Sequence, residues 1–204
     1  MRKLLADYGG RRIYKCLISY GRRLASYGSP HIKRYSFYLG GDQPVVTWTE
    51  RLRSSCGAFV GLMLVLTIAK QLGELSGIDE WLMASLGASA LLVFALPGSP
   101  MAQPWAVIAG NTLSALIGIT AAKFISEPLL AMPIAAACSI MGMFALRCLH
   151  PPAAAVALIA VLGHITQYHY AFFPVMVDSV LLVLAGTAYS NMTGKRYPNR
   201  PSSS

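Results

Sequence analysis

Two proline-rich breaks interrupt the hydrophobic part of this sequence, and they constrain its fold more than any other feature. Each break follows the tripeptide Phe-Ala-Leu, whose two copies at 94–96 and 144–146 are 50 residues apart. The first break runs from 97 to 104, and the second ends in His150-Pro151-Pro152. Proline ends a helix because it lacks an N–H group and its ring clashes with the preceding turn. The pattern therefore predicts two helix–break–helix units, with a new helix beginning near Pro104 and near Pro152.

The composition places these breaks in a membrane protein. The chain is 55% hydrophobic and only 12% charged, with a mean hydropathy of +0.52, whereas soluble domains carry about 25% charged residues. Backbone that is broken at membrane depth must line a cavity or be buried in protein, because lipid cannot satisfy its hydrogen bonds. A duplicated broken helix therefore indicates a transport path. The alternative is a pair of ordinary turns between spans.

Six apolar segments follow the polar N-terminal region. A straight span needs about 20 apolar residues, and the fifth segment is clearly apolar only as far as 163, so a half-helix is an alternative there. We predict an all-α, polytopic transmembrane helical bundle with an internal parallel repeat and Pro-broken helices. The expected helices are 53–72, 81–97, 104–125, 130–148, 152–169 and 172–192.

The charges predict how the chain is oriented. Eleven of its 17 Lys and Arg residues lie at or before Arg53, and the last ten residues contain three more. We divide the chain into a basic region at 1–50, a transmembrane domain at 51–194 and a tail at 195–204. The positive-inside rule then places both termini, and both breaks, on the cytoplasmic side. This arrangement requires an even number of spans.

The basic N-terminal region predicts a lipid partner. Arginines and lysines are interspersed with Leu, Ile and Tyr between Leu4 and Tyr27, which is consistent with an amphipathic helix on anionic lipids of the inner leaflet. A flexible tail and a transit peptide are the alternatives. Because the basic block adjoins an apolar span, we expect no nucleic-acid partner.

The two restarted helices suggest an anion site. The free N–H groups of a helix start carry about half a positive charge and bind anions, and Arg147 and His150 would lie beside them. An arginine within a span is costly, so Arg147 is expected to bind a substrate or to anchor at the inner interface. His150 is expected to bind an anion, to relay a proton or to cap the preceding helix.

Three further polar residues are candidates for the same path. Gln103 begins the third apolar helix and Asn111 lies in its first half, where both are expected to bind substrate. Asp178 lies within the sixth segment, where an acid is expected to relay a proton or to form an ion pair, for example with Arg147. An interfacial position close to Pro174 is the alternative for Asp178.

These motifs, taken in order, resemble the HPP family of integral membrane proteins. The resemblance covers 53–198 and is based on Ser-Pro-Met-Ala-Gln-Pro at 99–104, Gly-Asn-Thr-Leu-Ser-Ala-Leu-Ile-Gly at 110–118 and Leu-His-Pro-Pro-Ala-Ala-Ala at 149–155. It implies four spanning helices rather than six, and its cyanobacterial and chloroplast members imply nitrite transport. Trp105-Ala106 stands where the family often has Arg-Asn, and Asn111 stands where it often has His.

The sequence as a whole predicts a small transporter or channel for a small inorganic anion, with nitrite favoured. The alternative is a non-transporting sensor or partner-binding module. No enzyme motif is present, and we expect no catalytic residue, metal site or cofactor. We expect a homo-oligomer in a bacterial inner (plasma) membrane, with a plastid membrane as the alternative.

Overall fold

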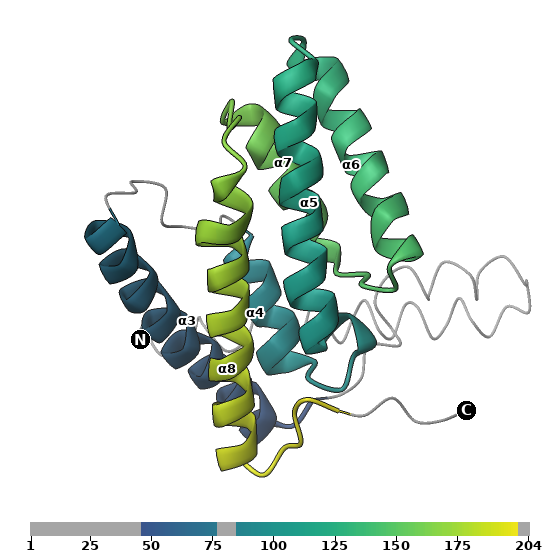
Figure 1. Cartoon of the computed structure of the whole chain (residues 1–204). Coiled ribbons are helices and arrows are strands. Elements are labelled where there is room, and N and C mark those ends of the chain that lie inside the picture. The colour runs from purple at the N-terminus through teal and green to yellow at the C-terminus, as the bar shows by residue number, and fades with distance from the viewer. Residues whose placement is uncertain (1–45, 77–84, 200–204) are drawn as a thin grey trace, which may run out of the picture. The chain divides into compact units, whose positions relative to one another are not determined.

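The computed structural model describes residues 46–76 and 85–199, and these residues form helices and no strands. The predicted amphipathic helix between Leu4 and Tyr27 lies outside the described residues. Figure 1 shows the helices as a bundle with α5 near its centre. The elements are α3 (Trp48–Ser76), α4 (Leu86–Ala95), η1 (Pro100–Ala102), α5 (Pro104–Phe124), α6 (Pro128–Ala145), α7 (Pro151–Leu162), η2 (Ala171–Met176) and α8 (Val177–Met192).

Four of these helices are long and apolar enough to cross a membrane: α3, α5, α6, and α8 together with η2. The other two, α4 and α7, have 10 and 12 residues. At 1.5 Å per residue they extend about 15–18 Å, which is roughly half of a 30 Å hydrocarbon core. Six apolar helices are therefore confirmed, but six complete spans are not. Four long helices agree with what the family resemblance implied, and the half-helix alternative for the fifth segment is confirmed.

Backbone geometry explains where the fifth segment ends. We expected it to continue to 169, but α7 stops at Leu162 and the chain turns at His164, whose φ is +52°. The N–H of Ile165 then donates to the carbonyl oxygen of Ala160 at 2.9 Å. A left-handed residue followed by this backward hydrogen bond is the Schellman ending of a helix, which reverses the chain before a full span is built.

Both breaks lie at the same end of the bundle, as the parallel repeat predicts. α4 and α6 end at the alanine of each Phe-Ala-Leu, and α5 and α7 begin with a proline, where a missing N–H costs nothing. The break segments contact one another directly. The indole nitrogen of Trp105 donates to the carbonyl oxygen of Leu146 at 3.1 Å, so the start of one unit is joined to the break of the other.

The tightest helix packing lies between α5 and α7. Gly118 of α5 brings its backbone so close to α7 that an added Cβ would lie 2.6 Å from the carbonyl oxygen of Ala157. The main apolar core surrounds this contact and includes Val107, Ile119 and Val156. α3 packs against α4 and α8, on the other side of the bundle from α6 (Figure 1).

Candidate functional site

Eight polar side chains of the described residues are fully buried in this apolar bundle, and we call six of them the interior polar residues; the other two are Ser139 and Ser190. Each is fully buried, with a relative exposure of 0%. They come from α4, α5 and α8 and from the residue that precedes α7. Ionisable side chains inside a membrane protein are rare and often mark ion or proton pathways, whereas serines also serve in helix packing. They are Ser89, Asn111, Ser114, His150, Asp178 and Ser179.

His150 joins the second break to the first through one ring nitrogen and to α4 through the other. Nδ1 lies 2.8 Å from the carbonyl oxygen of Met101 in the first break, and Nε2 lies 2.9 Å from the hydroxyl of Ser89 on α4. A carbonyl oxygen only accepts, so Nδ1 carries the proton and Nε2 of the neutral ring accepts from Ser89. His150 precedes α7 as its N-cap residue, which differs from the expected role as a cap on the preceding helix.

The electrostatics of His150 favour the neutral ring. This residue lies between α6 and α7, outside the long spanning helices. Burial lowers the pKa of His150, and the hydrogen bond to Met101 opposes that shift. A neutral imidazole with two hydrogen bonds fastens the breaks together, and it can take up a proton only by reorganising the bond to Ser89.

Asn111 and Asp178 belong to the same part of the interior. The amide nitrogen of Asn111 donates to the hydroxyl of Ser179 at 3.1 Å, and Asp178 is the neighbour of Ser179 in the first turn of α8. Asn111 is the eighth of the 21 residues of α5, about 10 Å from the start of that helix. Asp178 is fully buried among these helices.

Arg147 does not join these residues. It is exposed just beyond the end of α6, and its φ of +52° makes it the left-handed residue of a Schellman ending, in which the N–H of Cys148 donates to the carbonyl oxygen of Met143 at 2.9 Å. Asp178 lies in the first turn of α8, whose other end reaches the side of the breaks, so the structure does not pair Arg147 with Asp178.

Gln103 is used to hold the first break in place. Its amide nitrogen donates to the carbonyl oxygens of Pro97 at 3.0 Å and Ser99 at 2.9 Å, and its amide oxygen accepts from the backbone N–H of Asn199 at 2.9 Å. Both N–H groups of this amide and one lone pair of its oxygen are thus occupied. Gln103 orders the entry to α5 from its partly buried position.

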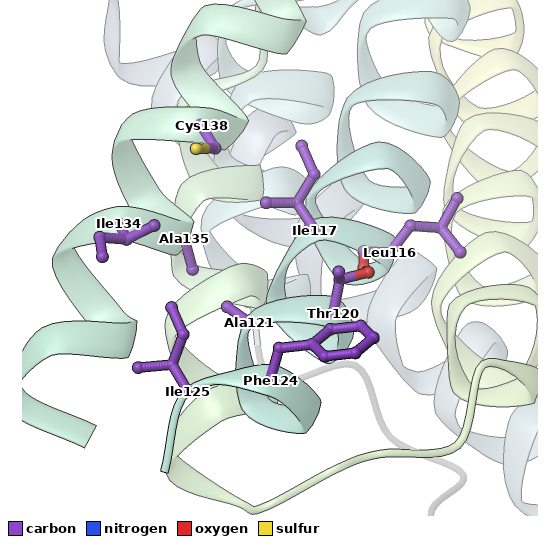
Figure 2. Close-up of a pocket in the computed structure, with 9 residues that line it drawn as sticks. All are labelled: Leu116, Ile117, Thr120, Ala121, Phe124, Ile125, Ile134, Ala135 and Cys138. Atoms are coloured by element: carbon purple, nitrogen blue, oxygen red, sulfur yellow. The ribbon is translucent and has the colours of Figure 1, made fainter. Parts of the chain in front are cut away.

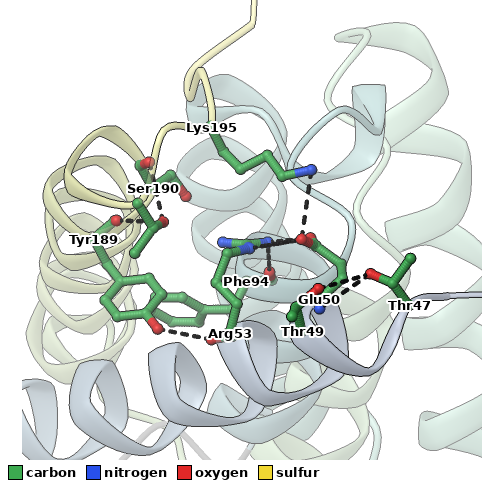
Figure 3. A network of polar contacts seen from close by, with 9 residues as sticks. Thr47, Thr49, Glu50, Arg53, Phe94, Tyr189, Ser190 and Lys195 are labelled. Carbon is green, nitrogen blue, oxygen red and sulfur yellow. Dashed lines mark hydrogen bonds and ion pairs between the residues drawn. The ribbon is translucent and has the colours of Figure 1, made fainter.

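A polar network at the break end of the bundle joins α3, α4 and α8 (Figure 3). Arg53 pairs with Glu50 at 2.6 Å and donates to the carbonyl oxygen of Phe94 at 3.0 Å. The hydroxyl of Tyr189 donates to the backbone oxygen of Arg53 at 2.8 Å, and Lys195 lies 3.5 Å from Glu50. This network ties the start of the first span to the end of the last.

The C-terminal segment closes the same end. The hydroxyl of Tyr197 donates to the carbonyl oxygen of Ala102 at 2.7 Å, and burial raises the pKa of Tyr197, so the phenol remains a donor. The first break is therefore covered by residues from the second break and from the segment after α8.

A cleft lies elsewhere, between α5 and α6 (Figure 2). Its volume is about 320 Å³ and its lining is almost entirely apolar, with Thr120 and Cys138 among the aliphatic and aromatic side chains. None of the predicted site residues lines it. The two helix starts were expected to face each other across a cavity, but the breaks are instead bonded to each other. Within residues 46–76 and 85–199, no cluster of three His, Cys, Asp or Glu side chains could hold a metal.

Sequence reasoning missed the serines of the interior. Ser89 and Ser179 are the partners of His150 and Asn111, yet neither stands near a motif that would distinguish it from the small residues used in helix packing. The one sequence signal for an interior serine was the spacing of Ser114 along α5. Ser114 lies one turn beyond Asn111 on the helix face that also carries Gly110 and Gly118.

The comparisons with known proteins agree with this architecture. A model of the HPP transmembrane region matches residues 43–198. One transmembrane protein of Dictyostelium discoideum is 30% identical over 177 residues, which are 82% of this chain and 57% of the relative. A second transmembrane protein of the same organism is 33% identical over 153 residues, which are 69% of this chain and 52% of the relative.

This chain therefore spans about half the length of the curated relatives that it matches. No solved structure matches it. The family model covers well over half of the residues, including both breaks and all of the interior polar residues. The chain is an integral membrane protein that belongs to the HPP family.

Proposed function

We propose that this membrane domain transports a small inorganic anion together with a proton, and that nitrite is the favoured substrate. The observation that carries the proposal is Asp178, a fully buried acid beside the hydrogen-bonded pair of Asn111 and Ser179. An ionisable residue inside the membrane is costly and is kept for ion or proton movement. In this proposal Asp178 relays the proton that compensates the charge of the anion.

The basic residues at the break end support the choice of an anion. Arg147 is exposed at the end of α6, and Arg53, Lys195 and Arg196 lie at the ends of α3 and α8 that the polar network joins. Positive charge at the mouth of a path raises the local concentration of anions. By the positive-inside rule, the same excess supports a cytoplasmic position for this end. In this proposal Arg147 attracts the substrate at the entrance rather than binding it inside.

The choice of nitrite rests on the family resemblance and the small size of the domain. The proposed membrane is the bacterial plasma membrane, with a plastid membrane as the alternative. A domain with four long helices encloses little space by itself, so a homo-oligomer is part of the proposal. A sensor or partner-binding module remains the second candidate.

The test is nitrite uptake by proteoliposomes that contain the purified protein, with and without an inward proton gradient. Asp178→Asn removes the charge and keeps the shape of the side chain. We expect this variant to lose gradient-driven uptake while still purifying as a folded protein. Glu74→Gln is the matched control, because Glu74 is an exposed acid at the end of α3 that pairs only with Lys70. Wild-type protein that moves no nitrite, nitrate, formate or bicarbonate would refute transport and favour the sensor.

A further inference from the structure

The hydroxyl of Ser179 determines which way the side-chain amide of Asn111 faces. The hydroxyl of Ser179 donates its single proton to the carbonyl oxygen of Val175 at 2.8 Å. Ser179 can therefore only accept from Asn111, which is 3.1 Å away, so the amide nitrogen must face Ser179. The amide oxygen, Oδ1, faces the other way.

This amide oxygen is a buried acceptor that no described residue satisfies. Oδ1 of Asn111 has no hydrogen-bond partner among residues 46–76 and 85–199, and the side chain is fully buried. The hydroxyl of Ser114, three residues further along α5, is equally buried and also lacks a partner within those ranges. Two such groups in one apolar helix are unusual, because nearly all buried polar groups are hydrogen-bonded.

Both groups lie near the middle of a spanning helix. Asn111 and Ser114 are the eighth and eleventh of the 21 residues of α5. At this depth lipid offers no hydrogen bond, so a water or a solute must supply the missing partner. The chemistry of that partner follows from the amide oxygen, which can only accept. The partner must carry an O–H or N–H group.

We propose that Asn111 Oδ1 and Ser114 Oγ form a binding site for a small neutral solute that donates a hydrogen bond, namely the protonated form of a weak acid. This inference rests on the proposed transport function and names the species that is moved. A bare anion presents only acceptors to Oδ1, whereas the acid donates its O–H to Oδ1 and accepts the hydroxyl of Ser114.

The proton balance of this step is simple. The anion takes one proton on the side where it enters, the neutral acid occupies the site, and the same proton leaves with the anion on the other side. One negative and one positive charge move together, so no net charge crosses the membrane. The proton gradient, rather than the membrane potential, drives net uptake.

The selectivity of the wild-type protein is the first test. Proteoliposomes are given nitrite or formate, which have weak conjugate acids, or nitrate, whose conjugate acid is strong. The membrane potential is clamped with potassium and valinomycin, and protein-free liposomes measure the background. We expect saturable uptake of nitrite and formate and none of nitrate. At low nitrite, the rate should rise roughly tenfold for each unit by which the external pH is lowered, because the neutral fraction rises by that factor. Nitrate uptake at a rate equal to that of nitrite would overturn the proposal.

Variants of the site are the second test. Asn111→Leu keeps the size of the side chain and removes the acceptor, and Ser114→Ala removes the hydroxyl. We expect each to raise the KM for nitrite about two- to tenfold, the usual range for one hydrogen bond. Thr112→Val is the matched control, because it removes a hydroxyl of the same helix that donates to the carbonyl oxygen of Ile108 at 2.8 Å, so KM should change less than in Asn111→Leu.

The outcomes separate this proposal from the proposed function. Nitrite uptake with an unchanged KM in both Asn111→Leu and Ser114→Ala would overturn the site and leave transport standing. An absence of uptake in the wild-type protein would overturn both. If Asn111→Leu does not fold, Ser114→Ala and the contrast between nitrite and nitrate still decide the question.

Discussion

The close approach of α5 and α7 makes Gly118→Ala the sharpest test of the packing. A Cβ at this position would lie 2.6 Å from the carbonyl oxygen of Ala157, 2.7 Å from its Cα and 2.9 Å from the Cβ of Ala160. Two of these three atoms are backbone, so no side-chain rotation can relieve the contact. To restore a 3.4 Å contact from 2.6 Å, α7 must move by about 0.8 Å.

The magnitude follows from two opposing effects. Replacing glycine by alanine inside a helix gains about 1 kcal/mol of helix propensity. Forcing an extra methyl group into a well-packed contact costs about 1–3 kcal/mol. We therefore expect Gly118→Ala to be about 0–2 kcal/mol less stable than the wild-type protein. Gly87→Ala, in the first turn of α4 where nothing lies within 4 Å, should be neutral or up to about 1 kcal/mol more stable.

The assay is reversible unfolding of the purified protein in mixed micelles by increasing denaturing detergent, followed by circular dichroism. The quantity compared is the free energy of unfolding of the two glycine variants. Displacing α7 also shifts His150, which immediately precedes it, so Gly118→Ala should reduce uptake and Gly87→Ala should not. The packing argument is wrong if both variants gain the same stability.

Two further predictions concern the second break. Because burial lowers the pKa of His150 below its ordinary 6.5, the unfolded chain binds a proton at this position more readily than the folded one, so the thermal midpoint should fall as pH drops below about 6.5. His150→Gln should flatten that slope, and an unchanged slope would show that another group is responsible. Arg147→Gly replaces a left-handed non-glycine residue by glycine, so its free energy of unfolding should exceed that of Arg147→Ala by about 1 kcal/mol. Equal free energies of unfolding would show that the φ of +52° carries no strain.

The helix boundaries near the breaks were predictable because proline acts locally. α5 begins at Pro104 and α7 begins at Pro151, within one residue of the sequence prediction. The lengths of the short helices were not predictable in the same way. The clearly apolar part of the fifth segment ends at 163, which allowed a half-helix as the alternative, but no proline marks the left-handed turn at His164 that ends α7.

The predicted site residues do not form one site in the structure, because a single sequence does not show which hydrogen-bond partner each side chain has. Asn111 and Asp178 were named from polarity alone, and both are buried in the interior. The partner of Asn111 is Ser179, and a serine in a spanning helix looks the same in the sequence whether it packs or forms a hydrogen bond. Gln103 was expected to bind substrate, yet its amide is largely used by Pro97, Ser99 and Asn199.

The most instructive separation is between Arg147 and His150, three residues apart in one break. The Schellman ending of α6 reverses the chain between them, so that the arginine is exposed and the histidine is fully buried. A charged guanidinium at the last carbonyls of α6 is favoured by the helix dipole, whereas a neutral imidazole bonded to Ser89 and Met101 satisfies two buried groups. The same short turn therefore places the positive charge of Arg147 at the surface and the neutral ring of His150 in the interior. This division is why we assign anion attraction to the break and solute binding to α5.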